Sequence, residues 1–150
     1  MDISWTARPF HDLSPVRVHA LYKVRVDVFV VEQNCPYPEV DDDDLVATHL
    51  LGMHAESIVA YARIIPPKYK GAIPHVGRVL VTAPYRGKGL AHRLMEVVHD
   101  ELRRMHGTAR SALAAQHHLR SFYEGHGYIS VGDVHDLDGI PHVDMVRTDP

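Results

Sequence analysis

The spacing of apolar residues changes several times along the chain and divides it into predicted strands and helices. Residues 48–67 contain two apolar runs joined by polar residues around Glu56 and Ser57, a pattern typical of a β-hairpin. The run from Val76 to Thr82 is largely apolar, which is typical of a central strand. From Leu90 onward, apolar residues instead recur at the spacing of a helix turn, so a helix with one apolar face is predicted there.

The segment between residues 16 and 33 carries two apolar periods at once. Its valines alternate as in a strand, but other apolar spacings within it suit one face of a helix. Ser14 followed by Pro15 supplies an N-cap and a first-turn proline, and a helix is therefore predicted. Residues 34–44 contain two prolines and four consecutive aspartates and are expected to form a loop.

The remaining segments complete a mixed order of strands and helices. Further strands are predicted at residues 3–10, 108–116, 128–134 and 141–147. A short helix with a glycine stop is predicted at residues 119–127, and a turn at residues 136–139. Only a layered α/β or α+β domain accommodates this order.

Composition and charge restrict the function. Apolar residues make up 45% of the 150 residues and the formal net charge is -3, so one globular domain spanning residues 1–150 is expected. This charge argues against general nucleic-acid binding, which requires a basic patch. The chain shows no run of about 18 apolar residues for a membrane span and no signal-peptide layout at its start, so a cytoplasmic protein is expected. The single cysteine, Cys35, excludes an internal disulfide and a zinc site built on several thiolates.

Residues 85–95, YRGKGLAHRLM, place two glycines between a predicted strand and a predicted helix. Gly87 and Gly89 would each weaken a regular element by roughly 0.5–1 kcal/mol, so a ligand that approaches the backbone explains them better than helix propensity does. Amides at the helix start, together with Arg86 and Lys88, would bind an anion such as a diphosphate. The alternative is a plain turn before a surface helix. The Walker and dinucleotide-binding patterns both fail, because the glycines do not fall at the required positions.

The pattern that does fit is R-x-x-G-x-A, from Arg86 to Ala91, preceded by RVLVTAPY. It resembles the coenzyme A (CoA) pyrophosphate loop of the GNAT-superfamily acetyltransferases. Further stretches, in order along nearly the whole chain, resemble the ElaA-like branch of that superfamily: RVDVFVVEQNCPYPEVDDDDL, AYARI, GRVLV, AQHHLRSFYEGHGY and DGIPH. The resemblance implies an α/β (α+β) class and the GNAT acyl-CoA acyltransferase fold, with a mixed twisted sheet of about six to seven strands flanked by helices.

The resemblance also implies acetyl-CoA as cosubstrate and no metal, with the pantetheine arm in a gap between two central parallel strands. The backbone of Leu80 and Val81 would face this arm, and an amide near Val81 would polarise the thioester carbonyl. The pyrophosphate would lie on the loop residues Arg86, Gly87, Lys88, Gly89, Leu90 and Ala91. At the end of the next strand, where the superfamily often has asparagine and then alanine, this chain has Gln116 and Leu119.

The catalytic residues are likewise expectations from the resemblance. Tyr123 matches the family tyrosine proposed to protonate the departing CoA thiolate, and its alternative role is packing on a short helix. The acceptor amine must lose a proton before it attacks, and the two candidate bases are Glu32, beside the acceptor-side loop, and His142, in the closing hairpin. Glu32 could instead form a cap or an ion pair with Arg25, and His142 could simply hydrogen-bond within its turn.

Other polar clusters were weighed as sites. His92, His99 and His106 are spaced by about 10 Å along a helix, too far apart for one metal ion, and they lie off the apolar stripe, so a solvent-facing row is expected. Residues 41–44 lack the pattern of a calcium loop and are expected to form an exposed acidic rim that could attract a cationic amine. Cys35 could act as a nucleophile, but packing is expected because no partner base is evident.

Together these features predict an acetyl-CoA-dependent N-acetyltransferase that transfers the acetyl group directly to an unidentified small-molecule or peptide amine. Neither nucleic acid nor a membrane is an expected partner, and a homodimer through an exposed edge strand is one assembly that this architecture allows. Two other functions stay open, because fold does not fix function. A non-catalytic acyl-CoA-binding module would tolerate the loss of Tyr123, and a small metal-binding regulator would carry stoichiometric zinc.

Overall fold

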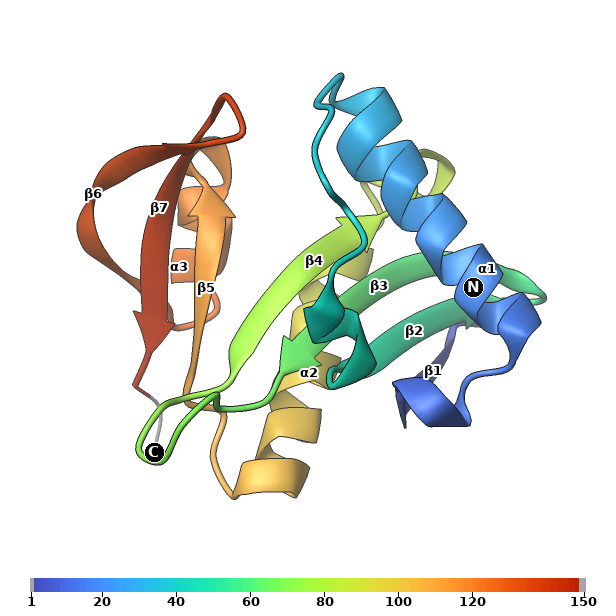
Figure 1. Ribbon diagram of the computed structural model, residues 1–150, viewed down its shortest axis with the longest axis horizontal. Helices are drawn as coiled ribbons and strands as arrows, with labels where there is room; N and C mark the ends of the chain where they lie inside the picture. Colours follow the sequence, from blue (N-terminus) through green and yellow to red (C-terminus); the bar gives the residue numbers. More distant parts are fainter. Residues whose placement is uncertain (1, 149–150) are drawn as a thin grey trace.

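The computed structural model describes residues 2–148 and has a seven-stranded mixed sheet at its centre (Figure 1). The strands follow the order β1-β2-β3-β4-β5-β7-β6. Their bounds are β1 Ser4–Pro9, β2 Thr48–His54, β3 Ser57–Ile65, β4 His75–Val81, β5 Ser111–Gln116, β6 Ile129–Leu137 and β7 Ile140–Arg147. The helices are α1 Pro15–Val26, α2 Leu90–His106 and α3 Arg120–Glu124. The predicted order of elements and the predicted α/β class are confirmed.

The segment with two apolar periods is helical. Ser14 Oγ accepts a hydrogen bond of 3.1 Å from the Arg17 amide and caps α1 as predicted. The helix then runs on as a π-helix over Asp27–Glu32. Leu21 and Val28 are buried against the sheet. Burial of this helical face explains why the helical period prevails over the alternation of valines.

The loop expected over residues 34–44 is only partly found. Its end turns into a short 3-10 helix, Asp42–Leu45, which begins with a capping box between Asp41 and Asp44. The carboxylate of Asp44 accepts from the Asp41 amide at 3.2 Å. This turn holds Asp44 fully buried, where it meets Arg25 of α1 and Arg63 of β3.

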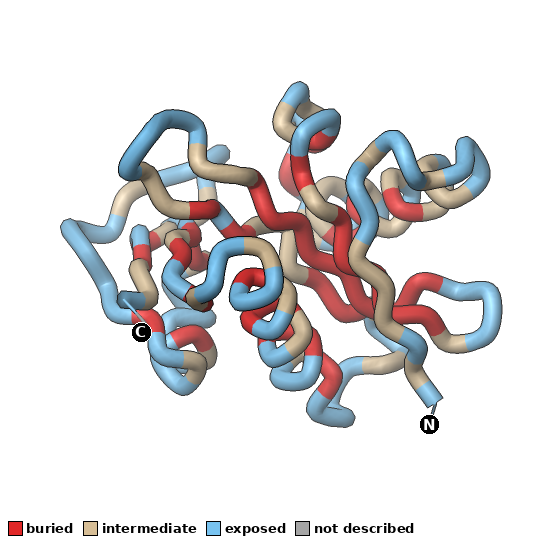
Figure 2. Tube along the Cα trace, turned by 90° about the horizontal axis from the view of Figure 1, so that it is seen from below, coloured by how far each residue is buried: buried red, intermediate tan, exposed pale blue. Residues whose placement is uncertain are grey.

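Helices α1 and α2 cover opposite faces of the sheet, and β3 contributes to the core on both faces (Figure 1). Ala60 and Ala62 pack in the core beneath α2, whereas Tyr61 packs in the core beneath α1. Because side chains alternate along a strand, Arg63 also points to the α1 face. Figure 2 shows the buried residues concentrated in these central strands. A buried guanidinium on the α1 face must find its partners in the segments that cover that face.

The sheet splits between β4 and β5. These two strands are parallel, and they pair only at His75 and Ala112. Figure 1 shows them starting side by side and diverging toward their C-terminal ends. Arg78 has a φ of +52° and lies where the register between β3 and β4 shifts, which marks a β-bulge. The bulge and the divergence leave a gap that opens beside the loop following β4.

The row of histidines on α2 is not uniformly exposed, so the expectation of a solvent-facing row is wrong at its middle member. His99 is 5% exposed, and its Nε2 lies 3.0 Å from the Tyr128 hydroxyl. The segment after α3 folds back over α2, and its Tyr128 covers this position. His92 is partnered as well, with its Nδ1 at 2.9 Å from His126 Nε2.

Candidate active site

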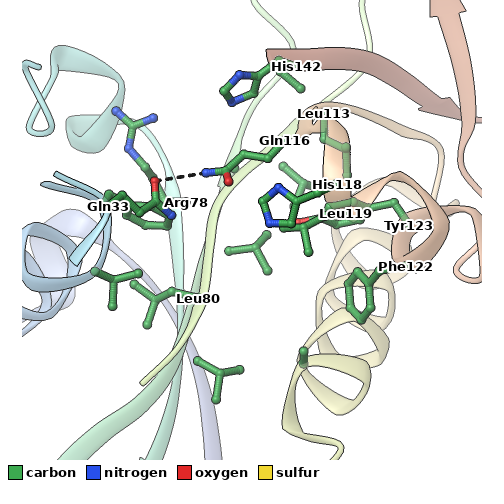
Figure 3. Close-up of a pocket in the computed structure, with 18 of the residues that line it drawn as sticks. Gln33, Arg78, Leu80, Leu113, Gln116, His118, Leu119, Phe122, Tyr123 and His142 are labelled. Carbon is green, nitrogen blue, oxygen red and sulfur yellow. Dashed lines mark hydrogen bonds between the residues drawn. The ribbon is translucent and has the colours of Figure 1, made fainter. Parts of the chain in front are cut away.

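A cleft of about 480 Å³ lies in the gap between β4 and β5. Its walls come from the π-helix after α1, from β4 and β5, and from α3. Of the residues predicted for the site, the following line it: Glu32, Leu80, Val81, Arg86, Ala91, Gln116, Leu119, Tyr123 and His142. Figure 3 shows Leu80 on one wall and Phe122 and Tyr123 on the opposite one.

The loop after β4 leaves the N-terminus of α2 open. Gly87 and Gly89 have φ values of +75° and +79°, a conformation that side chains disfavour. A Cβ at either position would have no atom within 4 Å. Within residues 2–148, the amides from Gly87 to His92 have no backbone hydrogen-bond partner. Free amides at a helix start with open space beside them form an anion site.

The loop residues divide between two hollows. Arg86 and Ala91 line the cleft. A neighbouring hollow of about 360 Å³, beside Trp5 of β1, is lined by Lys88, Gly89 and Leu90. Gly87 lines neither hollow. The loop thus crosses from one hollow to the other over the start of α2.

Arg86 joins the loop to both β4 and the π-helix. Its Nε donates to the Val81 carbonyl at 2.8 Å, and its Nη1 lies 2.8 Å from a Glu32 carboxylate oxygen. Glu32 therefore pairs with Arg86, and the alternative pairing with Arg25 does not occur. Both side chains of the pair are 43% exposed, so solvent screens the interaction.

The backbone at the end of β4 presents Val81 to the cleft. The Thr82 amide donates to the Val59 carbonyl of β3 at 2.9 Å. Because successive residues of a strand direct their amides to opposite sides, the Val81 amide faces away from β3. The Val81 carbonyl points the same way and meets Arg86. One strand amide is thus available to an oxygen atom inside the cleft.

Gln116 bridges the cleft. Its Nε2 donates to Oε1 of Gln33 at 3.1 Å, joining the end of β5 to the end of the π-helix (Figure 3). Leu119, the other position with an expected family contact, is 38% exposed and lines the same cleft. The bridge crosses the cleft on the side away from the glycine loop.

Tyr123 is buried at the wall formed by α3, with 6% of its surface exposed. Burial raises the pKa of its phenol, and the neighbouring Tyr128 adds to the shift. Its ring meets Phe122 edge-on, with centroids 5.0 Å apart. Tyr123 therefore both packs in the core and lines the cleft. Its phenol stays protonated throughout the neutral pH range.

His142 lines the cleft from β7, opposite Gln116 in the strand register. Its Nδ1 lies 2.7 Å from the Ile140 carbonyl oxygen. Because a carbonyl can only accept, Nδ1 carries the proton, and Nε2 of the neutral ring keeps a lone pair. The expected hydrogen bond within the turn thus leaves the other ring nitrogen able to act as a base.

A second cavity, of about 250 Å³, adjoins the cleft. Four polar side chains line both spaces: Gln33, Arg78, Gln116 and His142. Arg63, Cys35 and His75 line the second cavity but not the cleft. The bridge between Gln33 and Gln116 and the side chain of His142 therefore lie at the junction between the cleft and the second cavity.

A buried ionic network lies behind this second cavity. Arg25 is fully buried, with Nε at 2.9 Å from Glu39 and Nη1 at 2.6 Å from Asp44. Arg63 Nη1 lies 2.8 Å from Asp44 and 2.7 Å from Asp41. Hydrogen bonds from Arg63 hold the pKa of Asp41 below its ordinary value. Burial alone would raise the pKa of Asp44, but its bonds from Arg25 and Arg63 lower it.

These contacts correct the expectation of an exposed acidic rim. Asp44 is buried and Asp41 is bound to Arg63, while Asp43 lies 3.2 Å from Lys68. Most of the acidic charge is therefore neutralised by cations of the same chain and is not free to attract a cationic amine.

Cys35 is buried, and its Sγ lies 3.3 Å from the Asp138 carbonyl in the β6–β7 turn. This contact confirms the packing role. In residues 2–148, no group of three or more histidine, cysteine or acidic side chains is placed to hold a metal ion. No helix in that part of the chain combines the length and apolar character needed to cross a bilayer.

Comparison with known proteins identifies the architecture. Residues 25–148 match the family model described as "Acetyltransferase (GNAT) domain". The chain belongs to the GNAT acetyltransferase family. Protein ElaA of Escherichia coli strain K12 is 38% identical over 97% of this chain and 96% of that protein. The protein sll0451 of Synechocystis is 35% identical over 97% of this chain and 96% of that protein.

Solved structures agree with this assignment. An acyl-CoA N-acyltransferase from Pseudomonas aeruginosa has a TM-score of 0.93 at 36% identity, covering 98% of this chain and 100% of that chain. Escherichia coli ElaA has a TM-score of 0.92 at 37% identity, covering 97% of this chain and 99% of that chain. The predicted GNAT fold and the ElaA-like resemblance are confirmed.

Membership of the GNAT family implies an acyl-CoA cosubstrate, and the residues of this chain fit one. The open amides of the glycine loop suit a pyrophosphate. The gap between β4 and β5 suits an extended arm, and the Val81 amide is directed into it.

Sequence reasoning missed Gln33 and Arg78, which stand at the junction of the two spaces. Gln33 carries no sequence signal. Arg78, like Arg63, is a charged residue inside an apolar strand, and such residues are rarely buried without a partner. The acids of residues 39–44 offered the matching charges, so this pairing could have been predicted.

Proposed function

We propose that this GNAT protein transfers an acetyl group directly from acetyl-CoA to the amine of a small acceptor. One observation carries the proposal: a cleft in the split sheet has the open amides of the glycine loop at one end and the free Nε2 of His142 at the other. A phosphate-bearing donor and an amine acceptor would meet between these ends.

The reaction joins an amine to a thioester carbon. His142 Nε2 accepts a proton from the amine, whose nitrogen then attacks the thioester carbonyl carbon. The Val81 amide stabilises the negative charge that develops on the carbonyl oxygen. The carbon–sulfur bond breaks, its electron pair leaves with the sulfur, and Tyr123 donates a proton to that thiolate. The amide nitrogen then releases its second proton to solvent, His142 releases the proton that it accepted, and the phenol regains a proton from solvent, so the protein ends unchanged and one proton is released overall.

The pKa of Tyr123 bears on its role. An ordinary phenol has a pKa of about 10 and a thiol about 8.5, so this proton transfer is already uphill. Burial raises the pKa of Tyr123 and makes a full transfer harder. Tyr123 therefore acts best as a hydrogen-bond donor to the leaving sulfur, with the proton passing as the bond breaks.

A direct transfer is supported by Cys35. Its thiol is buried and bonded to the Asp138 carbonyl, and it lines the second cavity but not the cleft. A covalent acyl-cysteine would require a free thiolate beside the thioester. The acetyl group is therefore expected to pass in one step.

The first experiment measures thermal unfolding with and without acetyl-CoA. The wild type should gain about 2.7 kcal/mol at a hundredfold excess over Kd. Gly89→Asp should lose this gain, because it adds a negative charge to the anion site. Gly132→Asp is the matched control, since Gly132 has the same φ of +79° and equal free space, but lies in β6. A wild type that acetyl-CoA does not stabilise would contradict the proposal.

Tyr123→Phe separates an enzyme from a non-catalytic acyl-CoA-binding module. The substitution keeps the packed ring, so stability and acetyl-CoA binding should be unchanged. Turnover should fall by about a hundredfold, the lower range for loss of a general acid. Release of free CoA thiol measures it. Unchanged turnover would show that Tyr123 is not the acid, and binding without turnover on any amine in the wild type would favour the binding module.

A further inference from the structure

The second cavity is lined by the cationic side of the ionic network. Arg63 and Arg78 line it, but the carboxylates that hold them, those of Glu39, Asp41 and Asp44, do not. The acids stand behind the arginines and fix them in place. Asp138 is the one acid among the described residues that line the cavity, and it is exposed in the β6–β7 turn. The inner wall therefore presents guanidinium groups.

Two nitrogens of the Arg78 guanidinium are bonded within the network, and the third is left for a ligand. Its Nε lies 2.9 Å from Glu39, and its Nη2 lies 3.1 Å from the Glu39 carbonyl. The guanidinium also stacks over the Tyr37 ring at 5.5 Å. Nη2 also lies 3.4 Å from an Asp41 carboxylate oxygen. Nη1 donates no hydrogen bond within residues 2–148, and the side chain is 21% exposed. The bulge that gives Arg78 its positive φ is what turns this group toward the junction of the two spaces.

Arg63 provides a second, independent observation. The residue is 4% exposed, and its two terminal nitrogens bind Asp41 and Asp44. Its Nε is buried and has no partner among the described residues. A buried donor without an acceptor is unfavourable, and an anion in the cavity that Arg63 lines would remove the deficit.

We propose that the acceptor carries a carboxylate close to its amine, as an α-amino acid does, and that Arg78 and Arg63 bind this carboxylate. The inference rests on the proposed function, because it describes the acceptor of that reaction. The carboxylate would lie at Arg78 and the amine at Nε2 of His142, which lines the same cavity. Apolar neighbours on the cavity wall, Ile65, Leu137 and Ile140, would hold an aliphatic or aromatic side chain.

The volume agrees with a small acceptor. At about 250 Å³ the cavity lies just below the roughly 300–1,000 Å³ range of small-molecule sites. A simple diamine or polyamine would bring only positive charge to two guanidinium groups and is disfavoured. A carboxylate forms paired, charge-assisted bonds with a guanidinium, a fit that lysine does not reproduce.

The test measures binding, so it does not depend on turnover. Alanine, leucine and phenylalanine are titrated calorimetrically at pH 7 into the wild-type protein saturated with CoA, and each is compared with its own amide. The amide keeps the amine and side chain but loses the negative charge. At least one acid should bind about ten- to a hundredfold more tightly than its amide. If every amide binds as well as its acid, or if no acid binds, the proposal is overturned.

Two variants locate the effect. Arg78→Lys keeps the positive charge toward Glu39 but loses the planar fork, so it should weaken acid binding about tenfold and leave amide and CoA binding unchanged. Arg104→Gln removes an exposed arginine at the end of α2 and should change nothing. Equal acid affinity in wild type and Arg78→Lys would contradict the assignment of Arg78. Absence of CoA binding would instead contradict the proposed function, and the acids and amides would then be compared on the free protein.

Discussion

The two ends of the cleft are built in opposite ways. The glycine loop, residues 86–91, is exposed from Arg86 to Gly89, is continuous in sequence and offers mostly backbone amides without backbone partners. The end at Arg78 and His142 is assembled from separate segments of the chain, and most of its polar groups are already bonded to each other. One end offers unsatisfied donors to a ligand, and the other fixes side chains in place before a ligand arrives.

Because of this difference, one end of the cleft should govern ligand binding and the other the stability of the fold. Unpartnered amides at an exposed helix start stay hydrated and contribute little to folding, so the loop can be altered without unfolding the protein. Buried charges behave differently, because each one removed leaves its partner uncompensated. Substitutions at the loop should therefore change ligand binding, whereas substitutions in the network should change the free energy of unfolding.

The largest effect is expected from Arg25→Met. Methionine fills a similar volume, but Glu39 and Asp44 lose their fully buried partner. Breaking such a pair destabilises by about 3–5 kcal/mol, measured by urea unfolding at pH 7. Lys23→Met, on the same helix, removes a surface pair with Asp27 whose side chains are 68% and 56% exposed, and should change stability by less than about 1 kcal/mol. Similar effects of the two substitutions would contradict the stabilising role given to the buried network.

The next effect is on catalysis. His142→Gln should lower turnover by at least about a hundredfold, equivalent to about 2.7 kcal/mol in the barrier, because it removes the proposed base. His135→Gln is the control: its ring centroid lies 6.5 Å from that of His142, but it does not line the cleft. If both variants lose activity equally, His142 acts through structure and not as the base.

A smaller effect is expected in acid. Asp41 and Asp44 have pKa values lowered from 3.8, so they bind protons less readily in the folded state than in the unfolded state. Their contribution to stability is complete above pH 3.8 and is lost as the pH falls through the lowered folded values. Urea unfolding between pH 7 and pH 2 should show this loss below about pH 4. The loss should be smaller in Arg25→Met, where Asp44 has one partner fewer, and an equal loss would mean that other carboxylates cause it.

The contrast between the ends also explains what the sequence could predict. The loop lies within one stretch, its glycines have a local conformational reason, and its anion chemistry follows from a helix start. The order of strands and helices follows from local apolar spacing in the same way. The junction could not be predicted, because Gln33 meets Gln116 across 83 residues. The arginine partners of the aspartates at residues 41–44 also come from distant segments, α1, β3 and β4, but the charged residues inside apolar strands gave a local sign of that pairing.

Glu32→Gln tests the ion pair with Arg86, which connects the π-helix to the loop, and the smallest effect is expected from it. Glu32 and Arg86 are both 43% exposed, so their pair should contribute less than about 1 kcal/mol to stability. If His142 is the base, as proposed, and Glu32 only pairs with Arg86, neutralising Glu32 should change turnover by about threefold or less, equivalent to about 0.65 kcal/mol. Acetyl-CoA should bind slightly more tightly, since Arg86 is freed to meet phosphate. A hundredfold loss of turnover with unchanged binding would instead make Glu32 the base, and the proton acceptor would then lie at the loop end of the cleft, not at its junction with the second cavity.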